Sequence, residues 1–157
     1  MSLLELLTVV DHSAMAQTIQ ASKWIFPITE VFHLLGLATL GGAVILVNMR
    51  LMGWGLTHQP VAKLGRDVQP FLRGSLALMV LSGGTLFISE ATKCYYHEIF
   101  WYKMGLLATA LLYTFTWQKR VVFGPGVFGP GAQRLTAIVS MTLWSGVGIS
   151  GRWIGFT

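Results

Sequence analysis

Four long apolar runs constrain this chain more than any other feature of its sequence. Each contains about 20 mostly apolar residues, the length that an α-helix needs to cross the hydrocarbon core of a membrane. We predict transmembrane helices over residues 24–50, 70–89, 98–117 and 135–156. The chain of 157 residues is 54% hydrophobic and only 11% charged, which is too apolar for a soluble domain of this size. The sequence therefore predicts an all-α protein, a bundle of four transmembrane helices.

The first 22 residues differ from the bundle, which we assign to residues 23–157. Their leucines and valines are interrupted by Glu5, Asp11 and His12, and no basic residue precedes the apolar part. A secretory signal peptide would begin with positive charge and end in small residues at a cleavage site. The pattern instead favours an amphipathic helix in the membrane interface over a disordered or cleaved leader.

The basic residues predict the orientation of the bundle. Seven of them follow the first and third spans and are accompanied by one acidic residue, Asp67: Arg50, Lys63, Arg66, Arg73, Lys119, Arg120 and Arg134. Because basic loops face the cytoplasm, both termini are expected on the outer, periplasmic side of a bacterial inner membrane. The net charge of +5 then indicates orientation among membrane lipids, and no nucleic-acid partner is expected.

Several kinds of chemistry are excluded by motifs that the chain lacks. Cys94 is the single cysteine, which excludes an internal disulfide, a thiolate zinc cluster and a c-type haem attachment motif. Residues 124–131 form a doubled Gly-Pro-Gly turn between the third and fourth spans, without the lysine and hydroxyl of a phosphate-binding loop. No hydrolase motif is present, and we assign no catalytic residue.

Glu30 and His33 are two ionisable residues inside the first apolar run. Such groups are costly at membrane depth and usually mark a functional site. Their spacing of three residues places them on one helix face, which Gly36 continues without a side chain. The predicted orientation places the pair in the outer half of the membrane.

A b-type haem is one ligand that this face could bind. His33 would be the axial metal ligand, and Glu30 would accept the second N–H of its ring. Glycines of the first two spans, Gly36 among them, would let a flat ring approach the backbone. Lys103 and Arg152, which the orientation places near the outer surface, would neutralise the haem propionates.

The second axial ligand is left open by the sequence. No other histidine lies inside a predicted span. The candidates are His97, His12, Met104, Met79 and a histidine of a second subunit.

Two further interpretations compete with haem. Imidazole and thioether groups on the outer side, such as His33, His97 and Met15, would suit copper, although the methionines show no repeated spacing. Alternatively, Glu30 and His33 form hydrogen bonds that fix helix packing in a non-catalytic subunit. That subunit would anchor or assemble a larger membrane complex.

Five short motifs resemble a family of small, largely uncharacterised bacterial inner-membrane proteins with four helices. They are Pro-x-x-Glu-x-x-His-x-x-Gly within residues 24–36, the stretch 48–53, Phe-Trp-Tyr-Lys at 100–103, Trp144, and Gly-Arg at 151–152. The resemblance covers most of the chain and implies the four-helix architecture. More distantly, a helix-one histidine with a helix-three lysine is similar to the copper-resistance D proteins and the HemJ-type haem-binding protoporphyrinogen oxidases.

The sequence thus predicts a multi-pass membrane protein with a site centred on His33 and Glu30. The hypothesis that we carry forward is a b-type cytochrome-like protein that exchanges electrons with a quinone or a partner redox protein. The alternatives are an anchoring or assembly subunit and a copper-handling protein. The small size also makes a homo-oligomer or membership of a membrane complex an expectation.

Overall fold

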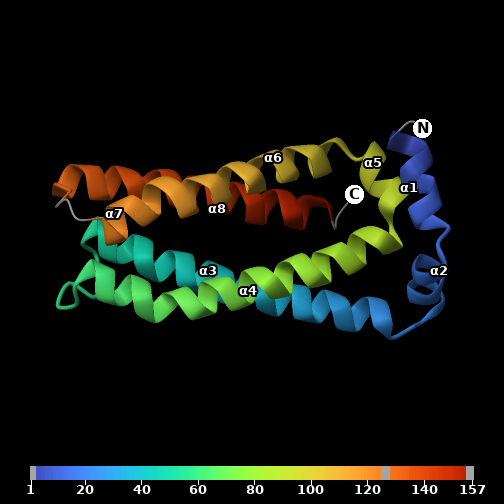
Figure 1. Ribbon diagram of the computed structural model, residues 1–157, viewed down its shortest axis with the longest axis horizontal. Helices are drawn as coiled ribbons and strands as arrows, with labels where there is room; N and C mark the ends of the chain where they lie inside the picture. Colours follow the sequence, from blue (N-terminus) through green and yellow to red (C-terminus); the bar gives the residue numbers. More distant parts are fainter. Residues whose placement is uncertain (1–2, 125–127, 155–157) are drawn as a thin grey trace.

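The computed structural model describes residues 3–124 and 128–154, and every regular element in those ranges is a helix. Long helical rods lie along the long axis of the molecule, and short helices gather at one end (Figure 1). Each predicted apolar run overlaps one rod, and the second and fourth rods begin earlier than predicted, at Val61 and Pro130. The prediction of an all-α fold is therefore confirmed.

Two of the rods form the first hairpin, α3 (Ile25–Met52) and α4 (Val61–Ser89). Both are long and apolar enough to cross a membrane by length and composition. α3 ends at Gly53, whose positive φ of 77° suits glycine. The Gly53 amide donates to the Arg50 carbonyl and the Trp54 amide to the Met49 carbonyl, so a Schellman motif closes the helix.

The third rod is one continuous run of helix made of three segments. α6 (Glu98–Tyr113) passes into the π-helical segment η1 (Thr114–Gln118) and then into α7 (Lys119–Phe123). The fourth rod is α8 (Pro130–Ile154). The link between them includes the predicted Gly-Pro-Gly turn, of which residues 125–127 lie outside the described residues.

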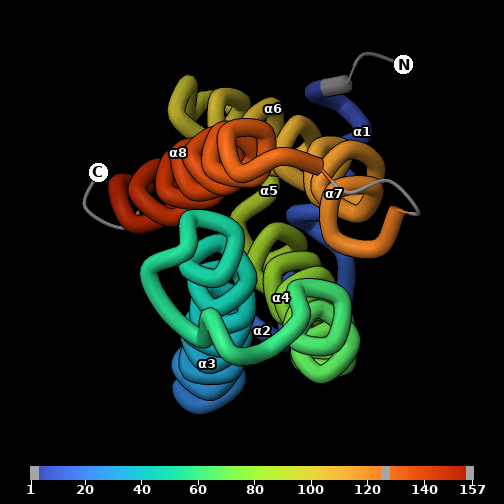
Figure 2. The backbone as a smooth tube through the Cα atoms, turned by 90° about the vertical axis from the view of Figure 1, so that its left-hand side faces the viewer, coloured from blue at the N-terminus to red at the C-terminus, as the bar shows by residue number. Residues whose placement is uncertain are grey.

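The rods pack in a ring that is closed most tightly at the hairpin turns. α3 packs against α4 and α8, α6 packs against α8, and α7 returns to α4. Figure 2 shows this arrangement along the bundle, with α6 and α8 over α3 and α4. The main apolar core lies at the turn end and is made of Ala43, Val47, Leu51, Leu64, Val68, Val121, Val122 and Ala137.

The opposite end carries α1 (Leu3–Asp11), α2 (Ala14–Ala21) and α5 (Ala91–Tyr96), with α1 against α5 and α2 against α4. The sequence predicted one amphipathic helix over residues 1–22, whereas the structure has two. The break has a local cause, because the Ser13 side chain accepts a hydrogen bond from the Ala16 amide and caps a new helix.

Candidate functional site

His33 lies on the face of α3 that meets α4, and its ring is half-buried there. The ring atom Nδ1 is 2.9 Å from the Ser82 hydroxyl oxygen. That hydroxyl has one hydrogen, and it donates it to the Leu78 carbonyl at 2.6 Å. With the hydroxyl hydrogen on the Leu78 carbonyl, Ser82 accepts from His33, and Nδ1 is then the protonated nitrogen. In the neutral ring, Nε2 then carries a lone pair that can bind a metal.

The close approach of the ring to α4 depends on a glycine. A Cβ atom at Gly83 would lie 3.2 Å from Cε1 of His33 and 3.6 Å from Nδ1. The Nδ1–Cε1 edge of the ring thus rests on the backbone of α4. The sequence interpretation assigned glycines of the first two spans to the approach of a haem, whereas Gly83 accommodates the His33 ring itself.

Gly36 also lies between α3 and α4, and the Met79 side chain occupies the space beside it. A Cβ atom there would lie 3.2 Å from Cγ and 3.3 Å from Sδ of Met79. Gly36 is therefore a packing position for Met79 of α4. The physical reason is the register of the hairpin, which brings Met79 directly opposite Gly36.

Glu30 was predicted to accept the second N–H of His33. Its side chain is exposed, and among the described residues the hydrogen-bond partner of His33 Nδ1 is the Ser82 hydroxyl. One turn of helix separates Glu30 from His33 along α3, whereas Ser82 faces His33 directly from α4. Glu30 is still near enough to act on the ring electrostatically.

Two basic residues approach from the other half of the bundle. Lys103 of α6 is half-buried, and its Nζ lies 3.5 Å from the position of a Cβ at Gly151 of α8. Lys103 acts electrostatically on both His33 and Cys94. Among the described residues, Nζ of Lys103 forms no hydrogen bond and no ion pair. Arg152 follows Gly151 in the last turn of α8 and has an exposed side chain.

The other ligand candidates lie at several different places. His97 is half-buried at the start of α6, where it links α5 to that helix. His12 is exposed between α1 and α2, and Met104 and Met15 point outward with 43% and 62% of their surfaces exposed. Within residues 3–124 and 128–154, no three His, Cys, Asp or Glu side chains gather as a metal site.

Cys94 lies on α5, in the segment that joins the second and third rods. Burial raises the pKa of its thiol above the ordinary value, and the Glu90 carboxylate raises it further. Lys103 and Lys93 oppose this change to a smaller extent. The neutral form of the thiol is therefore favoured in the folded protein.

A buried polar network in the interior of the bundle, toward the turn end, was missed by the sequence analysis. Asn48 donates to Ser140 at 3.0 Å, Ser140 donates to Gln118 at 3.1 Å, and Gln118 donates back to Asn48 at 3.0 Å. The three side chains come from α3, η1 and α8, and none is more than 6% exposed. Asn48 and Ser140 are polar residues inside predicted apolar runs and Gln118 directly follows one, which is the signal that could have indicated the network.

The segment η1 forms further polar contacts with α8. Thr114 accepts from the Trp144 indole at 3.0 Å, and the Trp117 indole donates to Thr136 at 3.2 Å. π-helical turns often occur at functional sites. Here the π-helical turn directs the side chains of Thr114, Trp117 and Gln118 toward α8.

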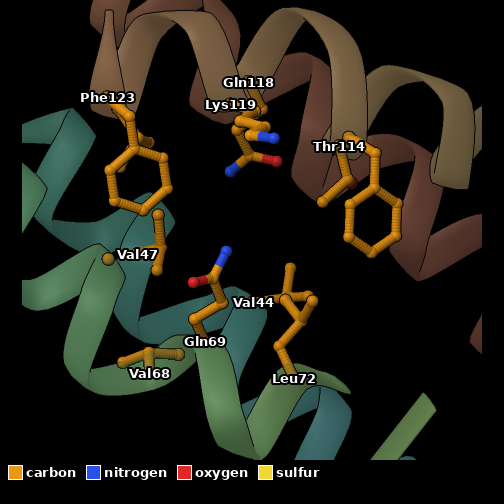
Figure 3. Close-up of a pocket in the computed structure, with 12 residues that line it drawn as sticks. Val44, Val47, Val68, Gln69, Leu72, Thr114, Gln118, Lys119 and Phe123 are labelled. Carbon is orange, nitrogen blue, oxygen red and sulfur yellow. The ribbon is translucent and has the colours of Figure 1, made fainter. Parts of the chain in front are cut away.

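A pocket lies beside η1, between the first hairpin and the third rod (Figure 3). Its walls are mainly apolar and include Val44 and Leu72. Gln69 of α4 and Gln118 of η1 point into it from opposite sides, and Lys119 lies above it (Figure 3). The pocket is at the turn end of the bundle, far along α3 from His33.

Comparison with known proteins gives a family but no activity. One family model matches residues 13–157 and describes a family of unknown function. No curated protein and no solved structure matches the chain.

Proposed function

The chain belongs to DUF6644, a family of unknown function, and we propose that it is a b-type cytochrome-like protein of a bacterial inner membrane. In this proposal a haem binds through His33 near the outer face. The haem exchanges electrons with a quinone or a partner redox protein. The observation that carries the proposal is the pairing of His33 with Ser82, which leaves Nε2 as a free metal ligand.

A four-span arrangement is supported by the distribution of apolar and polar side chains. Large apolar residues face outward on all four rods, with exposed fractions of 55% for Val31, 71% for Leu81, 67% for Leu112 and 65% for Ile149. The interior holds the Asn48 network instead. Apolar outer faces with hydrogen-bonded polar groups inside are typical of helices that contact lipid.

The proposed orientation has the two hairpin turns in the cytoplasm and both termini outside. The seven basic residues that predict the cytoplasmic side all lie on or near the segments that make these turns. Trp24 and Trp54, at the two ends of α3, are 75% and 79% exposed, as interfacial aromatic residues are.

The donor set fits a haem better than a dedicated copper site. A ligating histidine usually donates its second ring N–H to a neighbour, and Ser82 is that neighbour here. A haem needs a single histidine as a minimum, whereas a copper site built from protein ligands alone needs several convergent side chains. No such group of His, Cys, Asp or Glu is found among the described residues.

Cations beside the histidine support the same assignment. Lys103 lies between α6 and α8, half-buried and close enough to act on His33. A cation at membrane depth is costly without an anion. A haem propionate would be that anion. When bound, a haem supplies one-electron transfer, and the protein positions and insulates it.

The test is a haemin titration of the purified protein in mild detergent. The wild-type protein is expected to give a saturable Soret band with the position of a histidine-ligated haem. His33→Ala should lose it, while His58→Ala, which removes an exposed histidine of the α3–α4 loop, should retain it.

Three results would overturn the proposal, and two of them would favour an alternative. Equal Soret bands in His33→Ala and wild type would show that the haem binds elsewhere. A colourless, stable wild-type protein that retains about one copper per chain would favour copper handling. A colourless protein that migrates as a defined larger assembly would favour an anchoring subunit.

A further inference from the structure

We infer that the pocket beside η1 binds the ring of a benzoquinone-type molecule from the bilayer, with Gln69 and Gln118 as its hydrogen-bond donors. This inference locates the quinone of the proposed function and rests on that function for the choice of an electron carrier. The pocket itself is a second site, separate from His33.

The first argument is that the pocket has unused hydrogen-bond donors. The Gln118 amide has two N–H groups, and one of them donates to Asn48. Among the described residues, the other forms no hydrogen bond, and neither does the side-chain amide of Gln69. Gln118 is 94% buried, since its exposed fraction is 6%. Its Nε2 thus has one partner and one remaining N–H, and a buried N–H that faces a pocket is best satisfied by a ligand that accepts.

The second argument is the direction of these donors. Figure 3 shows the Gln69 and Gln118 side chains reaching into the pocket from opposite walls. The two carbonyl oxygens of a para-quinone point away from each other across its ring, so one ring can accept from both walls. A phospholipid carries its ester and phosphate oxygens together at one end, which fits two opposed donors less well.

The third argument is the character of the remaining wall. Val44, Leu72 and Phe115 line the pocket, and no acidic residue does. An apolar wall with a few placed polar groups is the usual composition of a small-molecule site. The exposed side chains of Phe115 and Lys119 lie at the outer side of the pocket, where a ligand could enter from lipid.

The position of the pocket relative to His33 suits a transmembrane electron path. Val44 is eleven residues after His33 on α3, which corresponds to about 16 Å at about 1.5 Å per residue. The haem site of the proposed function would then lie toward the outer face and the quinone toward the cytoplasmic face.

The experiment titrates the purified full-length protein with duroquinone and follows quenching of its tryptophan fluorescence. Saturable quenching is expected. Durene is the benzene that carries the same four methyl groups and no carbonyl oxygens, and it should displace duroquinone poorly. Gln69→Leu should raise the Kd by about threefold to tenfold, the effect of losing one hydrogen bond. Gln59→Leu is the matched control, because Gln59 is also half-buried but lies in the α3–α4 loop outside the pocket.

Three outcomes would overturn the inference. They are equal Kd values for Gln69→Leu and Gln59→Leu, binding of durene as tight as that of duroquinone, and a phospholipid retained in the pocket that prevents quinone binding. A visible spectrum of each sample separates this test from that of the proposed function. Quinone binding without a haem band would contradict the cytochrome proposal alone, and a haem band without quinone binding would contradict this inference alone.

Discussion

At the scale of single residues, the hydrogen bond between Ser82 and His33 has the largest consequence. It fixes which ring nitrogen carries the proton and holds the ring against α4. Removing the acceptor lets the ring change tautomer and rotate. Loss of such a partner typically costs a ligating histidine about 10–100-fold in affinity.

We therefore expect Ser82→Ala to weaken haem binding by about 10–100-fold in a haemin titration. Ser75→Ala is the matched control, since Ser75 is also a buried serine of α4 but donates only to the Leu72 carbonyl. If both variants bind haem as tightly as the wild type, Ser82 has no part in positioning His33.

Cys94 gives a prediction that depends on pH. Because burial and Glu90 raise the pKa of the thiol, the neutral form is favoured in the folded protein. Its contribution to stability is complete below the pKa of the unfolded chain and is lost as pH rises toward the folded pKa.

Iodoacetamide should therefore alkylate Cys94 more slowly in the folded than in the denatured protein at pH 8, with a pH midpoint displaced upward. Mass spectrometry of timed samples measures both rates. An exposed thiol introduced as Thr57→Cys in a Cys94→Ser background should show no such displacement. The same midpoint for folded and denatured Cys94 would contradict the burial argument.

At the scale of elements, the contact between α4 and α7 closes the ring at the turn end. A Cβ atom at Gly65 would lie 2.6 Å from Cγ1 of Val122 and 2.9 Å from Cζ of Phe123. At Gly74, on the same helix, a Cβ atom would meet nothing within 4 Å. The two glycines therefore differ in packing while sharing a helical backbone.

Gly65→Ala should lower the free energy of unfolding by about 1–3 kcal/mol, the usual cost of overpacking. Gly74→Ala should leave it unchanged or raise it by up to about 1 kcal/mol, because alanine favours helix. Thermal unfolding in detergent measures both variants. Equal melting temperatures would show that α7 does not pack tightly on α4.

The helices were predictable from the sequence, but the change of helix type and the contacts between helices were not. Hydropathy located the four rods because each is a long apolar run. It could not reveal η1, since Thr114–Gln118 carries no glycine or proline that would mark a change of helix type. The Asn48 network depends on the relative rotation of three helices, and a single sequence does not specify that rotation.

Individual residues of the candidate site were predictable from the sequence, but the contacts between them were not. His33 and Lys103 were identified as costly ionisable residues in apolar runs, and the structure places both toward the interior. The partner of His33 was assigned to Glu30 because spacing along one helix was the available information. Ser82 comes from another helix, and its register opposite His33 is set by packing between α3 and α4.

At the scale of the whole molecule, the account requires two sites on opposite sides of one membrane. The orientation can be tested with single cysteines in a Cys94→Ser background. A membrane-impermeant maleimide should label Lys23→Cys in intact spheroplasts, whereas Thr57→Cys should be labelled only after lysis. Labelling in the reverse pattern would invert the orientation and place His33 toward the cytoplasm.

The central claim is that one chain binds one haem through His33. Its most direct measurement is the ratio of haem b to protein, by the pyridine haemochrome method, after purification from membranes with an adequate haem supply. We predict about one haem per chain for wild type and for His58→Ala, and almost none for His33→Ala. A wild-type ratio near zero, or a His33→Ala ratio equal to that of wild type, would contradict it.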